Sequence, residues 1–200
     1  MLHAAARMRH SRTACAGLFR LACVLIVFGL LATARSLAGP QELWLLVDTG
    51  KLTLSVMRGE AVVKRYDNIA IGSNGSTRNK RVADEKTPLG DFRIIEVKLD
   101  SRFHRFLAID YPTMDHAQRA LEDGRLGQSE YDALRRAWNL GGPPPQDTRL
   151  GGHIGIHGIG AGDPAIHAAF NWTNGCIAVT NEQIDELLQW VGPGTRVSIR

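Results

Sequence analysis

Cysteine is scarce in this chain of 200 residues, which holds only three. Two of them, Cys15 and Cys23, fall in or beside a basic and then apolar N-terminal segment. The remainder has Cys176 alone and cannot form an internal disulfide, the usual reason for cysteine in an exported domain. A lone thiol in an oxidising compartment is a liability unless it is buried or used, so Cys176 is the first residue to explain.

Long hydrophobic runs are also missing. Four arginines between residues 7 and 20 precede an uncharged run at residues 21–34, which is shorter than the roughly 20 apolar residues of a membrane-spanning helix. Ser36-Leu37-Ala38 then supplies the small residues that a signal peptidase reads. We predict a signal peptide or signal anchor at residues 1–38 with cleavage before Gly39. The protein is then exported to the periplasm or cell envelope and touches a membrane only through an uncleaved leader.

Neither charge nor aromatic content indicates a nucleic-acid partner. The formal net charge of +4 includes five leader arginines, so residues 39–200 are near neutral. Aromatic residues make up 6% of the chain, and no basic patch with interleaved aromatics is present. About 160 residues suffice for one domain with a core but hardly for two. We therefore predict a single domain at residues 39–200.

The first half of this domain has the pattern of β-structure. Residues 52–57 alternate between apolar and polar side chains, as in a half-buried strand. Other short apolar runs bounded by turn residues also predict strands: 43–47, 61–63, 68–72 and 92–97. The segment 73–86 is polar and rich in lysine and arginine, and we predict a mobile loop there, closed by a tight turn at residues 86–90.

The second half alternates helices with short strands. Thr113 can cap a helix that runs to about Asp123, and Ser129 has the spacing of a second cap. After a Gly/Pro linker, residues 153–157 predict a strand, and a loop is expected from 159 to 172. A capping box at Thr180 opens a further helix, and residues 196–199 predict the last strand. The sum is a mainly β domain with a helical insertion and one helix after Cys176.

A cysteine nucleophile needs a base to take its proton and an anion site for the oxyanion that forms at a carbonyl. Gly175 allows a substrate to come close, and the backbone N–H groups of Gly175 and Cys176 are candidates for the anion site. His157 is the best candidate for the base, 19 residues upstream. Its position between a predicted strand and a loop allows the chain to fold it back onto Cys176.

Three groups of residues carry a resemblance to a known family. His157-Gly158, the run Thr173-Asn174-Gly175-Cys176-Ile177 and Asn181 together resemble the L,D-transpeptidase catalytic (YkuD-like) motif. Residues 86–94 are similar to the Thr-Pro-x-Gly segment of that family, so the likeness covers most of residues 43–200. Residues 172–181 together with 103–112 look more like the YafK-like subgroup.

The resemblance implies an L,D-transpeptidase-type β-sandwich and a role for each motif residue. Cys176 is then the nucleophile and His157 the general base and later acid, oriented by the backbone carbonyl of Gly158. Thr173 and Asn174 are expected at the substrate. No metal or organic cofactor is expected, and a neighbouring imidazolium would favour the thiolate of Cys176.

The implied reaction is acyl transfer on peptidoglycan stem peptides at meso-diaminopimelate, through a thioester on Cys176. An amine acceptor gives a cross-link, as in an L,D-transpeptidase, and water gives hydrolysis. Two positions depart from the family pattern: Asn174 replaces a second histidine, and Ala178 replaces an arginine that is expected to hold a substrate carboxylate. These departures leave the acceptor open.

Three alternatives stand beside transpeptidation. A murein amidase or L,D-carboxypeptidase would use the same thiol with water as acceptor and could release a wall-anchored protein, as some members of the YafK-like subgroup do. A non-catalytic murein-binding module would have no use for the thiol. A zinc peptidase would use imidazole ligands from His153, His157 and His167.

Overall fold

The computed structural model describes residues 42–200, so the predicted leader and the cleavage before Gly39 lie outside the described residues. A mixed eight-stranded sheet dominates the domain, and its strands follow the order β3-β2-β1-β10-β6-β7-β8-β9. These are β1 (Leu43–Asp48), β2 (Thr53–Arg58), β3 (Ala61–Asp67), β6 (Gly90–Ser101), β7 (His104–Ile109), β8 (Gly155–His157), β9 (Ile177–Ala178) and β10 (Arg196–Ile199). The short strands β4 (Ser76–Thr77) and β5 (Thr87–Pro88) pair separately.

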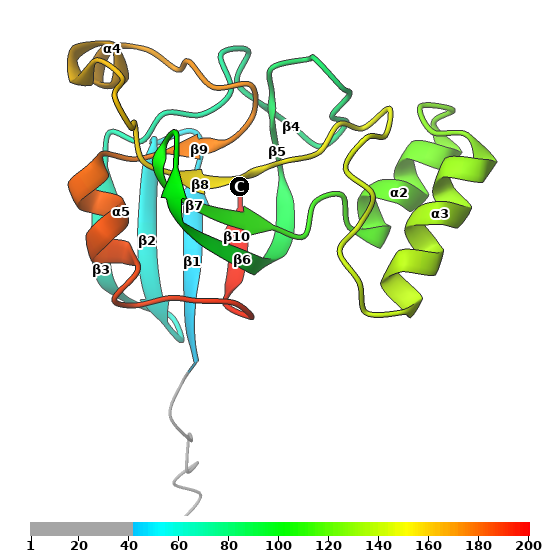
Figure 1. Ribbon diagram of the computed structural model, residues 1–200, viewed down its shortest axis with the longest axis horizontal. Helices are drawn as coiled ribbons and strands as arrows, with labels where there is room; N and C mark the ends of the chain where they lie inside the picture. Colours follow the sequence, from blue (N-terminus) through cyan, green and yellow to red (C-terminus); the bar gives the residue numbers. More distant parts are fainter. Residues whose placement is uncertain (1–41) are drawn as a thin grey trace, which may run out of the picture. The chain divides into compact units, whose positions relative to one another are not determined.

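The sheet changes direction along its longest strand, β6. The first part of β6 pairs with β10, from Gly90 opposite Ile199 to Arg93 opposite Arg196. The remainder pairs with β7, from Ile94 opposite Ile109 to Ser101 opposite His104, with two irregularities in register. As a result β7, β8 and β9 cross in front of β1 and β10 (Figure 1). The predicted mainly β class is confirmed, and the sandwich is made by one continuous sheet.

The core lies between these two parts of the sheet. It is built from aliphatic and aromatic side chains that are almost completely buried, among them Leu45, Val56, Ile94, Leu107, Ile156, Ile177 and Val197. Most of the predicted strands supply such residues. The predicted strand at 68–72 forms only isolated bridges, Ala70 with Ala178 and Gly72 with Thr173, so it joins the segment after β3 to the segment around β9.

The helical insertion follows β7 and consists of α2 (Met114–Glu122) and α3 (Gln128–Asn139), which lie to one side of the sheet (Figure 1). Thr113 is the N-cap of α2, and Gly124 follows its end with a φ of +67°, as predicted. The expected cap at Ser129 is wrong. Helix α3 begins earlier, where the Gly127 N–H donates to the Glu130 carboxylate at 3.3 Å.

Two further helices lie beside β8 and β9. Helix α5 (Asn181–Leu187) follows the predicted capping box of Thr180 and Gln183. Helix α4 (Pro164–Ala169) interrupts the segment predicted as a loop, because Asp163 accepts the Ala165 N–H at 2.7 Å and Pro164 suits the first turn. Within residues 42–200, no helix is long and apolar enough to span a membrane.

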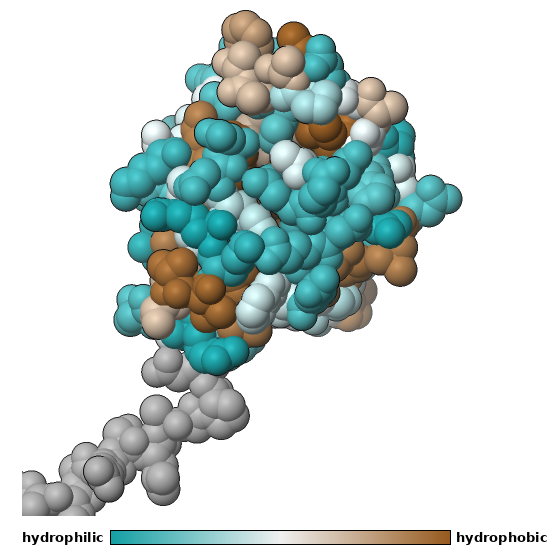
Figure 2. Space-filling view, turned by 90° about the vertical axis from the view of Figure 1, so that its left-hand side faces the viewer, coloured by the Kyte–Doolittle hydropathy of each residue, from teal (hydrophilic) through white to brown (hydrophobic). Residues whose placement is uncertain are grey.

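The face that carries β3 and α5 is largely hydrophilic, with apolar residues in small separate groups (Figure 2). Lys64 of β3 pairs with Glu186 of α5 at 2.6 Å, which joins the two elements across the surface. Val62 is among the exposed apolar residues. This face lacks the broad apolar patch that marks many docking surfaces.

His116 attaches the helical insertion to the sheet. Its ring stacks on Phe92 of β6 with centroids 5.3 Å apart, and only 4% of the residue is exposed. Nε2 donates to the Leu89 carbonyl at 3.0 Å, and Nδ1 accepts from the Thr113 hydroxyl at 2.7 Å. Both bonds suit the neutral ring, and burial lowers the pKa of His116 to about 4.

The pKa of His116 predicts a pH-dependent stability. Because the folded pKa lies below the unfolded value of about 6.5, the contribution is complete above pH 6.5 and is lost as the pH falls towards 4. The loss amounts to about 3 kcal/mol. We expect His116→Gln, which can keep both bonds without titrating, to make this part of the profile shallower in urea unfolding between pH 7 and 4; His157, whose pKa is also lowered to about 4, still contributes in this range. His153→Gln is the control, since that side chain lies largely in water; an unchanged profile in His116→Gln would contradict the assignment.

Candidate active site

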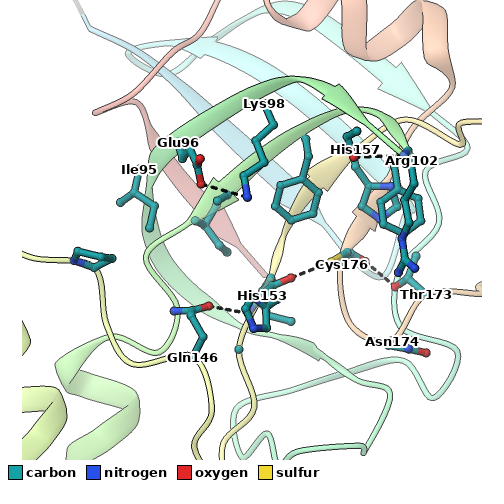
Figure 3. Close-up of a pocket in the computed structure, with 18 of the residues that line it drawn as sticks. Ile95, Glu96, Lys98, Arg102, Gln146, His153, His157, Thr173, Asn174 and Cys176 are labelled. Carbon is teal, nitrogen blue, oxygen red and sulfur yellow. Dashed lines mark hydrogen bonds and ion pairs between the residues drawn. The ribbon is translucent and has the colours of Figure 1, made fainter.

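A cleft of about 890 Å³ opens beside β6, β7, β8 and the segment that precedes β9. Cys176, His157, Thr173 and Asn174 lie at one end, while Glu96 and Lys98 of β6 lie farther along (Figure 3). These residues come from three separate segments of the sequence, at 96–98, 157 and 173–176, and the fold brings the three segments to one cleft.

The register of two parallel strands positions the predicted catalytic pair. Ile156 of β8 lies opposite Ile177 of β9, and His157 opposite Ala178. Cys176 lies two residues before Ala178, the residue opposite His157. Because side chains alternate along a strand, residues two apart point to the same face, and both Cys176 and His157 line the cleft.

The His157 ring is held from several sides. Its Nδ1 donates to the Gly158 carbonyl at 2.6 Å, which leaves Nε2 as the unprotonated nitrogen of the neutral ring. Phe103 and Phe106 stack on it, with centroids 4.2 and 5.9 Å away, and Trp172 meets it edge-on at 5.8 Å. The residue is 1% exposed. Sequence reasoning missed these three aromatic residues; Phe106 belongs to β7, a strand that was not predicted, and Phe103 lies in the turn before it.

Burial also sets the protonation of His157. It lowers the pKa of the imidazole to about 4, and the charge of Arg102 acts in the same direction, while the bond to Gly158 opposes the shift. At neutral pH the ring is uncharged and its Nε2 can accept a proton, which is what a general base requires.

The turn before Cys176 needs the residues that the motif supplies. Gly175 has a φ of +124°, and a Cβ there would lie 2.6 Å from the Lys86 carbonyl oxygen, so no larger residue fits. Thr173 is buried; its hydroxyl accepts the Gly175 N–H at 3.1 Å and donates to the Cys176 carbonyl at 2.7 Å. The Thr173 hydroxyl is thus engaged within the turn, whereas Asn174 is exposed at the cleft.

The Cys176 thiol is partly exposed and donates to the His153 carbonyl at 3.5 Å. Burial of its sulfur raises the pKa of Cys176 to about 11, although a Gly155 N–H and the charges of Lys80 and Arg102 act against the shift. With His157 also neutral, the resting pair is a thiol and an imidazole. The expectation of a thiolate beside an imidazolium does not describe this state.

Beneath Gly175 lies the segment 73–86, which was predicted as a mobile loop. Lys80 is 3% exposed and its Nζ pairs with Asp84 at 2.6 Å. Asp84 also accepts the backbone N–H groups of Arg81 and Lys86 at 2.7 and 2.9 Å. The segment is largely a loop, as predicted, but the buried Lys80–Asp84 pair and the backbone bonds to Asp84 hold it in place, while Arg78 and Arg81 stay exposed. The Lys80 carbonyl also accepts from Arg125, at 3.2 Å, in the connection between α2 and α3.

Asn181 fixes the chain on the other side of His157. Its side chain accepts from the Gly160 N–H and donates to the Gly160 carbonyl, both at 2.9 Å. The turn that begins with Gly158 is thereby tied to the first residue of α5. This contact accounts for an asparagine at that position of the motif.

The three histidines of the zinc alternative do not come together. The His153 side chain is mostly in solvent, Nδ1 of His157 is bonded to Gly158, and Nδ1 of His167 accepts from Trp172 at 3.3 Å. Within residues 42–200, no three His, Cys, Asp or Glu side chains are arranged to hold a metal ion.

Ala178 is completely buried and lies in a bridge to Ala70, with backbone bonds of 2.9 and 2.8 Å in the two directions. Ala178 shares the strand face of Cys176 and His157, but neighbouring residues cover it and it does not line the cleft. The arginine that the family pattern has here is therefore absent both from the sequence and from this part of the wall.

The family assignment rests on a match over nearly the whole described part of the chain. The model of the L,D-transpeptidase catalytic domain family (YkuD) matches residues 42–199. This chain belongs to that family. A search among curated proteins finds no match.

Solved structures share the fold of this L,D-transpeptidase-family domain. The helical cell shape determining protein Pgp2 from Campylobacter jejuni has a TM-score of 0.54 and 19% identity, over 80% of this chain and 47% of its own. Bd1075 from Bdellovibrio bacteriovorus has a TM-score of 0.50 and 20% identity, over 80% of this chain and 48% of its own. The chain thus spans about half the length of each.

The buried ion pair predicts a strong effect of one substitution. Asp84→Ala leaves the Lys80 ammonium buried without its partner, and we expect a loss of about 3–5 kcal/mol in the free energy of unfolding, measured with urea. Asp67→Ala removes an exposed carboxylate near Arg65 and should cost less than about 1 kcal/mol. The double variant Lys80→Met/Asp84→Ala should recover part of the loss. No recovery would show that the pair matters for another reason.

The raised pKa of Cys176 predicts that the thiolate forms only at high pH. The difference in absorbance at 240 nm between the protein and its Cys176→Ala variant should stay near zero at pH 6–8 and rise only towards pH 11. The Cys176→Ala subtraction removes the signal of the other cysteines. A thiolate plateau already present at pH 6 would mean that Cys176 and His157 form an ion pair at rest.

Proposed function

We propose that this chain is an exported cysteine acyltransferase that acts on peptidoglycan stem peptides at meso-diaminopimelate, as an L,D-transpeptidase. One observation carries the proposal: the register of β8 and β9 holds Cys176 and His157 on one face of the cleft, with Nδ1 of His157 bonded to Gly158. Family membership supports the substrate class.

In the proposed first step, Nε2 of His157 accepts the thiol proton as Sγ of Cys176 attacks the carbonyl carbon at the L-centre of meso-diaminopimelate. The tetrahedral intermediate collapses to a thioester and expels the amine of the next residue, D-alanine. His157 gives that amine its proton. Because thiol and imidazole are both neutral at rest, His157 takes the proton of Cys176 during the attack. No thiolate–imidazolium pair forms before the substrate binds.

The oxyanion needs donors near the attacked carbonyl. In our proposal the Cys176 N–H is the first donor, since no bond of the turn engages it. The Gly175 N–H joins it when the oxyanion replaces the Thr173 hydroxyl as acceptor. Thr173 then acts at the substrate through the turn that it holds, and Asn174 contacts the stem peptide directly from the edge of the cleft.

In the second step an amine attacks the thioester and gives a new amide. Water in the same place gives hydrolysis, which is the amidase or carboxypeptidase alternative. The scheme uses only Cys176, His157 and backbone groups, and no step calls for a metal or organic cofactor.

The test is mass spectrometry of muropeptides after incubation of tetrapeptide-rich sacculi with the protein. We expect new 3→3 cross-linked dimers, and stems with an exchanged terminal residue when a D-amino acid is added. Cys176→Ala should abolish both products. His157→Gln should slow product formation by about 100-fold or more, because it removes the general base.

A matched variant serves as the control. His116→Gln removes a buried histidine outside the cleft and should keep the activity. Shortened stems without any new amide would replace transpeptidation by hydrolysis. Identical muropeptides from the protein and from Cys176→Ala would favour a murein-binding module.

A further inference from the structure

Arg102 lies in the turn between β6 and β7 and lines the end of the cleft that holds Cys176 and His157. It is exposed, and its guanidinium lies 4.5 Å from the centroid of the Phe103 ring, the same ring that stacks on His157. Figure 3 shows its side chain pointing into the cleft, towards Thr173 and Cys176. The guanidinium is thus a positive charge beside the reacting groups.

The charge of Arg102 is not neutralised within the domain. Lys98, the other strongly basic residue of the cleft wall, pairs with Glu96 at 3.4 Å. On the same hairpin, Arg105 pairs with Asp185 at 3.1 Å. Among residues 42–200, no carboxylate lies within ion-pair distance of Arg102. The positive field reaches both catalytic groups, since it lowers the pKa values of His157 and of Cys176.

The turn that carries Arg102 is fixed by its neighbours. The Phe103 N–H donates to the Ser101 hydroxyl at 3.2 Å, and His104 pairs with Asp185 at 2.8 Å. Gly160 packs so closely that a Cβ there would overlap the Arg102 carbonyl oxygen. The fixed turn and the contact of the guanidinium with the Phe103 ring reduce the freedom that Arg102 loses when a planar anion binds.

We infer that Arg102 binds a carboxylate of the substrate and so helps to select the stem peptide. The inference rests on the proposed function for the identity of that substrate. A stem tetrapeptide offers two free carboxylates near the scissile bond, one at the D-centre of meso-diaminopimelate and one on the terminal D-alanine. Guanidinium groups form paired, charge-assisted hydrogen bonds with carboxylates. Arg102 thereby supplies from the β6–β7 turn a cation that position 178, buried as alanine, does not provide.

The test measures binding and turnover separately. Calorimetry with the Cys176→Ala protein gives the affinity for three tetrapeptides: the free acid, the peptide amidated at the D-centre, and the peptide amidated at the C-terminus. We expect amidation of the contacted carboxylate alone to weaken binding by about 10- to 100-fold. Adding Arg102→Gln should weaken binding of the free acid by the same factor, so that the free acid no longer binds more tightly than that amide. Arg102→Lys should restore part of the affinity for the free acid. Arg58→Gln, an exposed arginine of β2, is the control for the change of net charge.

The amide that loses affinity identifies which carboxylate Arg102 contacts. An Arg102→Gln protein that still prefers the free acid as strongly as the parent protein overturns the inference. Turnover of the same peptides by the protein with Cys176 intact tests the proposed function independently. Charge-dependent binding without turnover keeps Arg102 as the carboxylate site and removes the acyl transfer. Turnover that does not depend on Arg102, with equal affinity for all three peptides, keeps the acyl transfer and overturns the carboxylate site. If the protein neither binds nor turns over these peptides, both the carboxylate site and the proposed function are overturned.

Discussion

The parallel pairing of β8 with β9 is the constraint on which the site depends. Each strand is very short, and the pair fixes His157 and Cys176 in a two-residue offset. A slip by one residue would turn one of the two side chains into the core, since alternate residues face opposite sides. Ile156 and Ile177, both completely buried, prevent this slip because they anchor the strands in the hydrophobic core.

Support for this register comes from parts of the chain that carry no chemistry. The helical insertion bonds to Leu89 through His116 and to Lys80 through Arg125. The segment that contains Lys80 lies against Gly175, and Asp84 balances the charge of Lys80. The insertion therefore supports the turn that holds Cys176. Its removal would first free the Lys80 segment and then the turn at Gly175 that this segment contacts.

The sequence predicts this fold well where local patterns decide it. Thr113 and Thr180 cap helices, and the alternation around Val56 marks a strand. It predicts less where the answer depends on distant partners. Lys80 belongs to a polar segment that looks mobile until Asp84 and the cysteine turn surround it. The motif around Cys176 predicts the nucleophile, but two of the aromatic rings that hold His157 come from β7 and the turn before it, and nothing local links Phe103 to a histidine 54 residues later.

The neutral resting pair bears on how a lone cysteine would survive in the oxidising compartment to which we predict export. Oxidation and disulfide exchange need the thiolate, and burial of the sulfur raises the pKa of Cys176 to about 11. The thiol is thus almost fully protonated at neutral pH. Binding of a carboxylate at Arg102 would neutralise the charge that disfavours a proton on His157, and the imidazole would become a stronger base at the moment when the carbonyl is in reach. In the proposed mechanism, the same arrangement protects Cys176 from oxidants and reserves its reactivity for an anionic substrate.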